Sequence, residues 1–237
     1  MFFPTKHENV VALKSILTKT NYNAGISKML HENQETVPSS VHDHPDWHRG
    51  RQDYSVWLIE LGGGEFFQKF NAAKGLLSDF LIKPYQRQPH ITIFVSGFLA
   101  DTPRYDDDYS PEQLKRHLHL LREAAGKPFT LEIGGLNSFS SAPFLEVADL
   151  EGGLDRVRAL MLKTGKDIGR SDYTSGYTPH ITVGLYSGVF PGSAVTGRIS
   201  SFPKAPCKVA VDRITFASYR AQEMFGALTY RYEVVLH

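Results

Sequence analysis

One short phrase occurs twice in this chain of 237 residues: Pro-His-Ile-Thr, at positions 89–92 and again at 179–182. Each copy contains a histidine, His90 or His180, followed two residues later by a threonine. An imidazole titrates near neutrality, at a pKa of about 6.5, and can therefore both accept and donate a proton. A threonine hydroxyl can donate a hydrogen bond to an oxygen that gains negative charge. Two such pairs could perform acid–base chemistry on one small group held between them.

Both phrases continue into apolar residues and are typical of short strands, at 90–95 and 180–185. Side chains alternate between the two faces of a strand, so each histidine shares a face with its threonine, while the isoleucine between them points the other way. The candidate catalytic set is therefore His90, Thr92, His180 and Thr182. By the same alternation Phe94 shares the polar face of the first strand and could contact a bound base.

The remaining pattern predicts the elements that must position these strands. Apolar runs predict strands over 54–61, 129–133, 143–148, 209–219 and 229–236. Helical spacing predicts helices over 65–79, 110–126 and 150–166, and Ser110-Pro111 before Gln113 is a good start for the second of them. The order of elements indicates an α+β fold with a rough internal duplication. Residues 1–50 are expected to form an N-terminal extension with a helix over 8–19, ahead of a domain over 51–237.

Composition narrows the class of protein. With 41% hydrophobic and 22% charged residues the chain is ordinary for a globular protein, and no apolar run reaches the roughly 20 residues that span a bilayer. Cys207 is the single cysteine, which fits the reducing cytoplasm. A net charge of +1 without a basic stripe argues against binding of duplex DNA. We expect a cytoplasmic monomer whose partner is a small phosphate-bearing nucleotide or an RNA end.

The paired His-x-Thr motifs resemble those of the two-histidine (2H) phosphoesterase superfamily, over roughly residues 50–237. The resemblance implies a bilobal duplicated fold, with two antiparallel or mixed sheets around a central cleft and helices outside. It also implies hydrolysis of a 2′,3′-cyclic phosphate or a 2′,5′-linked nucleotide without a metal or other cofactor. In that mechanism one histidine is the base and the other the acid, assigned here as His180 and His90 respectively, and the two threonines bind the non-bridging oxygens.

Side chains just upstream of the two strands are candidates for binding the rest of a nucleotide. Aromatic rings there could stack on a base, and an arginine could meet a further phosphate. These candidates are Tyr85, Arg87, Tyr173 and Tyr177.

Two alternatives stay open at this point. Residues 42–48 hold three histidines and two aspartates and resemble the ligand run of metallo-β-lactamase-like hydrolases, with one residue inserted before the last histidine. His42, His44 and His48 could therefore bind zinc in a zinc-dependent hydrolase. The other alternative is a module that binds RNA ends without catalysis, although intact His-x-Thr motifs argue against it.

Overall fold

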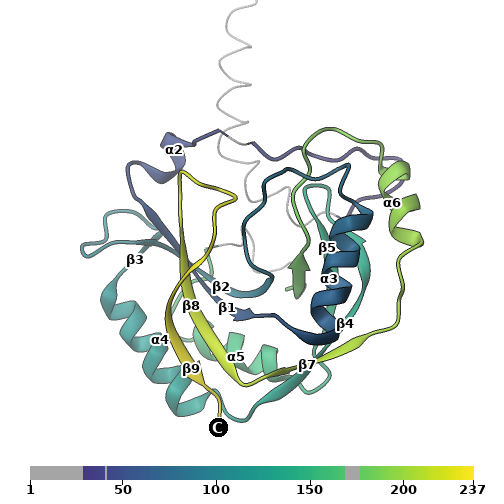
Figure 1. The fold of residues 1–237 in the computed structure, drawn as a ribbon. Helices are drawn as coiled ribbons and strands as arrows, with labels where there is room; N and C mark the ends of the chain where they lie inside the picture. The colour runs from purple at the N-terminus through teal and green to yellow at the C-terminus, as the bar shows by residue number, and fades with distance from the viewer. Residues whose placement is uncertain (1–28, 41, 169–176) are drawn as a thin grey trace, which may run out of the picture.

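A single curled sheet organises the computed structural model, which describes residues 29–40, 42–168 and 177–237 (Figure 1). Nine strands join this sheet, in the order β7-β4-β5-β6-β2-β1-β8-β9, with β3 pairing alongside β2. The strands are β1 (Asp53–Glu60), β2 (His90–Leu99), β3 (Asp108–Tyr109), β4 (Phe129–Ser138), β5 (Pro143–Ala148), β6 (His180–Thr182), β7 (Cys207–Val211), β8 (Arg213–Arg220) and β9 (Thr229–Val235). The helices are α2 (Pro45–His48), α3 (Gly64–Leu76), α4 (Pro111–Ala124), α5 (Gly153–Leu162) and α6 (Gly192–Ser200).

The expectation of two separate sheets is wrong. The motif strands β2 and β6 pair with each other, antiparallel, and this pairing joins all strands of the described chain into one sheet. All neighbouring strands are antiparallel except β2 and β3. The mixed α and β content and the predicted strands agree with the structure. The predicted strand over 209–219 is divided at Asp212 into β7 and β8.

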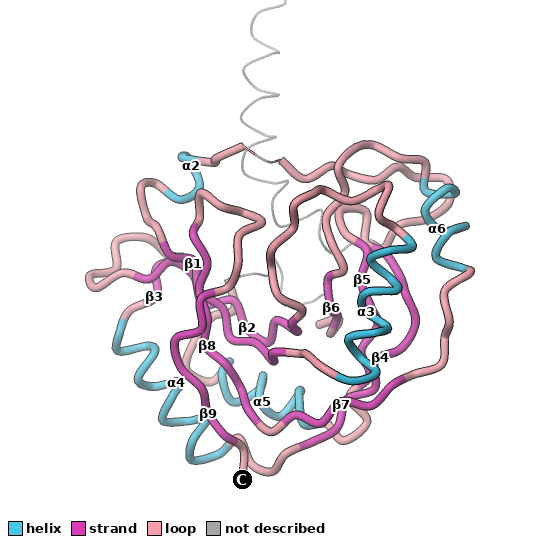
Figure 2. The backbone as a smooth tube through the Cα atoms, viewed as in Figure 1, coloured by secondary structure: helices cyan, strands magenta, loops and turns pink. Residues whose placement is uncertain are grey.

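Helices from one half of the sheet pack against the other half. Figure 2 shows β1, β2, β8 and β9 on one side and β4 to β7 on the other. Helix α3 directly follows β1 in the chain but contacts β7, whereas α5 follows β5 and contacts β2. Because each half buries a helix from the other, the two halves form one interlocked core.

Local sequence explains where α4 begins. The Ser110 Oγ accepts the backbone N–H of Gln113 at 3.2 Å, and the Gln113 side chain accepts the N–H of Ser110 at 2.8 Å. Pro111 occupies the first turn, where its missing N–H costs no helical bond. This capping box confirms the predicted helix start.

Helix α6 was not predicted, because its sequence carries a weak helical signal. It contains Gly192 and Gly197 and has no side-chain cap at Pro191. Tertiary contacts hold it instead: the Gly192 N–H donates to the Gln34 carbonyl, and a Cβ at Gly192 would collide with the His31 carbonyl. Packing on the upstream segment therefore decides this helix.

The segment 29–39 runs along the second half of the sheet. Its backbone bonds to Ser138, Ser140 and Phe190, and Thr36 is buried. Residues 29–39 of the predicted extension thus pack against the sheet, and the predicted helix over 8–19 lies outside the described residues. None of the helices in the described ranges has the length and apolar character of a membrane span.

Candidate active site

The two His-x-Thr motifs lie side by side at the centre of the sheet. Ile91 of β2 is the direct partner of Ile181 of β6, and both side chains are fully buried against the core. In this antiparallel register residue 90 lies opposite residue 182, and residue 92 opposite residue 180. The motif histidines and threonines therefore project together from the opposite face, where all four are half-buried: His90, Thr92, His180 and Thr182.

The outer strands place one glutamate beside each histidine. Glu60 of β1 is the cross-strand partner of His90, and Glu146 of β5 is the partner of His180. Each histidine therefore lies between a threonine and a glutamate in a row that crosses the strands. From β1 to β5, one row reads glutamate, histidine, threonine and the other reads threonine, histidine, glutamate. We call this surface, formed by the residues of β1, β2, β6 and β5 that point away from the core, the polar face.

A backbone carbonyl fixes each imidazole. The Nδ1 of His90 lies 2.8 Å from the Gln88 carbonyl oxygen, and the Nδ1 of His180 lies 2.8 Å from that of Thr178. A carbonyl can only accept, so Nδ1 carries the hydrogen in both rings. In the neutral state Nε2 is then the proton acceptor, and both rings are set up for acid–base work at that nitrogen.

The pKa values of both imidazoles are lowered. Burial, with the Arg87 cation and His180 nearby, lowers the pKa of His90 from 6.5 to about 4. Burial also lowers the pKa of His180. The influence of His180 on the pKa of His90 agrees with the position of both rings in one site.

Two aromatic rings contact the His180 imidazole. Phe139 meets the imidazole edge-on at 5.1 Å between ring centroids, and Phe144 does so at 5.6 Å. Phe144 is also the cross-strand partner of Thr182. Neither ring was among the predicted site residues. The predicted strand over 143–148 contained Phe144, but its neighbour in the sheet could not be read from the sequence.

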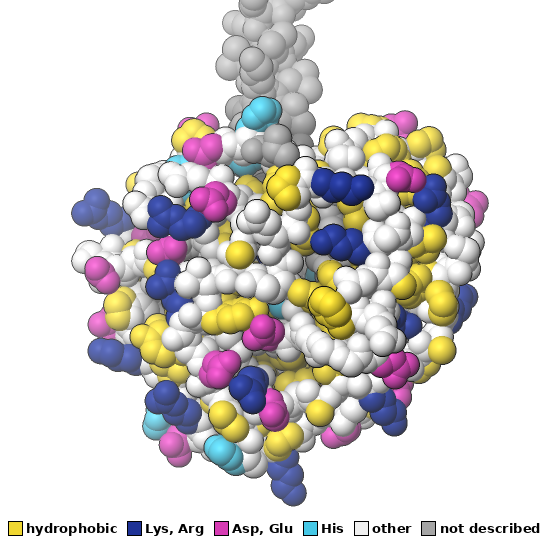
Figure 3. Space-filling view, viewed as in Figure 1, with side chains coloured by type: hydrophobic (Ala, Val, Ile, Leu, Met, Phe, Trp, Pro, Cys, Tyr) yellow, Lys and Arg dark blue, Asp and Glu magenta, His cyan; other side chains and the backbone are white. Residues whose placement is uncertain are grey.

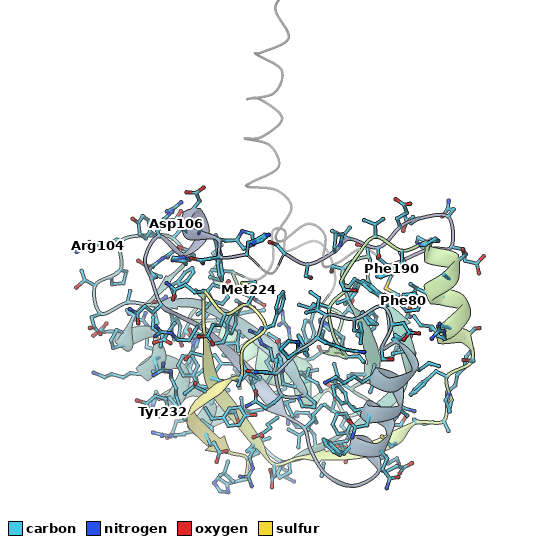
Figure 4. The ribbon with its side chains drawn as sticks, turned by 45° about the horizontal axis from the view of Figure 1, so that its top comes forward. Phe80, Arg104, Asp106, Phe190, Met224 and Tyr232 are labelled. Carbon is cyan, nitrogen blue, oxygen red and sulfur yellow. The ribbon has the colours of Figure 1, made fainter. Side chains whose placement is uncertain are left out.

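Arg87 lies close enough to His90 to lower its pKa, and Tyr85 lies near Arg87. The Arg87 guanidinium donates to the Met224 carbonyl at 2.8 Å and lies 3.8 Å from the Tyr219 ring centroid. Burial raises the pKa of Tyr85, while the Arg87 charge opposes that rise. Figure 4 shows Met224 on the loop between β8 and β9 near the middle of the molecule. The loop between β8 and β9 therefore holds Arg87 close to the site.

The prediction that Phe94 faces the ligand is wrong. Trp57 pairs with Phe94 and Leu58 with Thr92, so Ile93 is an extra residue in the ladder, a β-bulge. The bulge reverses the alternation. Phe94 is 1% exposed and packs edge-on against His117 in the core.

Tyr177 lies under the bulge rather than over the ligand. Its hydroxyl donates to the Thr92 carbonyl at 2.8 Å, and the Arg158 guanidinium lies 3.8 Å from its ring centroid. Arg158 also donates to the Ile93 carbonyl and forms a buried ion pair with Asp167 at 3.2 Å. We call Arg158, Asp167 and Tyr177 the bulge bracket. This arrangement corrects the stacking role predicted for Tyr177. The fourth upstream candidate, Tyr173, lies outside the described residues.

The alternative zinc site is not formed. Gly50 donates its N–H to the Nδ1 of His48 at 3.0 Å, so Nε2 carries the hydrogen and bonds Asp43 at 3.0 Å. Neither ring nitrogen of His48 is left for a metal. Within the described ranges no three histidine, cysteine or acidic side chains converge as metal ligands, so His42 and His44 do not form a metal centre with His48.

Figure 3 shows basic and acidic side chains interspersed over one face of the molecule, without a continuous basic stripe. This distribution agrees with the small net charge of the sequence.

Comparisons with known proteins identify the fold. LigT of Escherichia coli, solved with 3′-AMP, superposes with a TM-score of 0.50 at 15% identity, over 78% of this chain and 98% of that one. The protein TT0787 of Thermus thermophilus gives a TM-score of 0.50 at 16% identity, over 77% and 97%. No curated protein matches in sequence. The family model of the 2′-5′ RNA ligase superfamily matches residues 66–223, which include both motifs. The chain therefore belongs to the 2′-5′ RNA ligase superfamily, the two-histidine phosphoesterases.

Proposed function

We propose that this protein is a metal-independent phosphodiesterase that opens a 2′,3′-cyclic phosphate or cleaves a 2′,5′-linked nucleotide or RNA end. The observation that carries the proposal is the pairing of Ile91 with Ile181, which brings both His-x-Thr pairs onto one face. Family membership supports phosphoesterase chemistry in general. The crystal structure of LigT with 3′-AMP shows that a protein of this fold binds a small nucleotide.

The site contains the groups that hydrolysis requires. One neutral imidazole removes a proton from water as the oxygen attacks phosphorus. The second, protonated imidazole gives its proton to the departing sugar oxygen as the P–O bond breaks, so the proton count is unchanged. Each such positioned group contributes about 10²–10⁴-fold. The hydroxyls of Thr92 and Thr182 donate to the two non-bridging oxygens, where negative charge develops.

The low pKa of His90 supports His90 as the base, with His180 as the acid, the reverse of the assignment from sequence. Burial, with the Arg87 cation nearby, keeps His90 neutral with a pKa of about 4, and a base must be neutral to accept a proton. Burial also lowers the pKa of His180. The pair titrates as a coupled system, so a bound phosphate anion raises both values.

The finer expectations from the sequence stay part of this proposal: a cytoplasmic monomer whose partners are small nucleotides or RNA ends rather than duplex DNA. A buried Cys207 and the interspersed surface charge support it.

The direct test is turnover of the four 2′,3′-cyclic nucleotides and of a 2′,5′-linked dinucleotide, with and without EDTA. We expect hydrolysis that EDTA does not change. His119→Ala serves as the control, because His119 is exposed on α4, away from the motif strands. Equal activity of the wild type and of a His90→Ala, His180→Ala double variant would remove the basis of the proposal.

A further inference from the structure

Glu146 lies beside His180 on the polar face, and the proposed acid–base chemistry does not use it. As direct partners on β5 and β6, the two side chains leave the sheet on the same side, with Cβ atoms roughly 5 Å apart. The row across the strands runs from Thr92 through His180 to Glu146. Glu146 is exposed. Because it is the partner of His180, its carboxylate borders the position proposed for the phosphate.

Asn137 of β4 holds this carboxylate in place. Its Nδ2 donates to Glu146 Oε1 at 2.8 Å, while its own Oδ1 accepts the Ser138 N–H at 2.8 Å. Both contacts agree on the orientation of the amide. In the part of the chain that the structure describes, Glu146 makes no ion pair that would neutralise its charge. The carboxylate is oriented and still able to accept further hydrogen bonds.

Two glycines leave space around the second carboxylate oxygen. A Cβ added at Gly134 or Gly135 would lie 3.7 or 3.6 Å from Glu146 Oε2. Neither glycine is among the residues with positive φ, so backbone conformation does not require glycine at either position. Larger side chains there would pack against Oε2, which the Lys204 side chain also approaches, since its Cγ lies 3.9 Å from the Gly135 Cβ position.

Glu60, the glutamate beside His90, lies near a tyrosine instead of an asparagine. Burial and the nearby Glu60 carboxylate raise the pKa of the Tyr230 phenol, which places Glu60 beside that ring. The cation close to the site, Arg87, also lies in that half. The site is therefore asymmetric: positive charge lies beside His90, and an oriented carboxylate lies beside His180.

A carboxylate only accepts hydrogen bonds and repels phosphate, so its ligand must present neutral donors. Guanine alone among the four bases has two adjacent N–H donors on one edge, at N1 and the 2-amino group. In adenine and cytosine an acceptor nitrogen lies next to the amino group, and in uracil two carbonyls flank the single N–H. We propose that Glu146, oriented by Asn137 beside Gly134 and Gly135, binds guanine, so that the enzyme prefers guanosine on the His180 side of the phosphate. This proposal rests on the proposed phosphodiesterase function.

The distance is suitable for a nucleoside. Strand β6 carries His180 and β4 carries the two glycines. The distance between these strands is two strand spacings, roughly 10 Å. A nucleoside whose phosphate lies between the histidines extends over this part of the sheet.

The test compares kcat/KM for the four 2′,3′-cyclic nucleotides in the wild type, Glu146→Gln and Glu132→Gln. Gln keeps the shape of Glu146 but replaces one acceptor with a donor. Since a bidentate pair discriminates by about 1–3 kcal/mol, we expect a fall on the order of 10- to 100-fold for the guanosine substrate only. Glu132, on β4 and 4.0 Å from Lys208, is the matched carboxylate, and its variant should behave like the wild type.

An equal fall for all four substrates, or no fall for guanosine, overturns the guanine subsite while leaving the phosphodiesterase intact. If the wild type hydrolyses none of the four, the proposed function fails, and calorimetric binding of guanosine and adenosine 3′-monophosphates decides the subsite separately. A guanosine preference that Glu146→Gln abolishes supports the subsite. Equal dissociation constants for the two nucleotides in the wild type overturn it.

Discussion

Ile91 and Ile181 are direct partners in the antiparallel pairing of β2 with β6, and both are fully buried. Ninety residues separate them in the chain, yet this one pair sets the register of both motifs (181 − 91). A slip by one residue would turn one histidine and one threonine into the core. The burial of the two isoleucines therefore specifies the geometry of the polar face.

Removing either motif histidine should abolish most turnover of a cyclic nucleotide. For His90→Ala and His180→Ala we expect losses on the order of 10²–10⁴-fold in kcat, because each ring performs one proton transfer. The double variant should be little worse than either single one, since the groups act as a unit. Steady-state kinetics with circular dichroism to verify folding measures this. Additive losses in the double variant would contradict concerted action.

Replacing either threonine should cost less than replacing a histidine. Thr92→Val and Thr182→Val keep the volume and remove the hydroxyl that is proposed to bind a non-bridging oxygen. We expect a fall in kcat on the order of 10²-fold for each, with little change in KM, as for loss of a charge-stabilising donor. A change confined to KM would show that the hydroxyl binds the ground state equally well.

The pH dependence should be shifted toward acid. In the proposed mechanism the free enzyme is active when one imidazole is neutral and the other protonated, and both pKa values lie below 6.5, that of His90 at about 4. The maximum of the kcat/KM profile should therefore lie below pH 6.5. This places it below the neutral value expected for unperturbed histidines. A maximum above pH 7 would contradict the lowered values.

Stability should also depend on pH in the same window. Because the folded-state pKa of His90 is lower than its unfolded value of 6.5, the unfolded chain binds more protons between pH 4 and 6.5. Stability should therefore fall as the pH falls from 6.5 toward 4. His90→Gln should weaken this dependence in urea denaturation, and His119→Gln, an exposed control on α4, should leave it unchanged.

The bulge bracket should matter for both stability and catalysis. Asp167→Asn leaves the Arg158 cation buried without its partner, and we expect a loss of about 3–5 kcal/mol in the free energy of unfolding. Tyr177→Phe removes the hydroxyl that bonds the Thr92 carbonyl and should cost about 1 kcal/mol. If the bracket positions Thr92, Tyr177→Phe lowers kcat more than its stability loss explains. Unchanged kcat in a folded Tyr177→Phe variant would limit the bracket to a structural role.

Local sequence determined much of this protein. The repeated His-x-Thr phrase, the alternation of His90 with Ile91 and the capping box at Ser110 depend on neighbours within a few residues. Such short-range patterns follow from strand pleating and helix termini, so the catalytic candidates and most elements could be predicted.

Tertiary structure decided the rest, because it depends on which strands are neighbours. The bulge at Ile93 sends Phe94 into the core, and only the pairing with β1 reveals it. The contact of Glu146 with the site requires β5 to lie beside β6. The low pKa of His90 comes from burial and from Arg87, which the distant Met224 carbonyl holds in place. Burial, charge and register join residues far apart in the chain, so a single sequence read locally could not supply them.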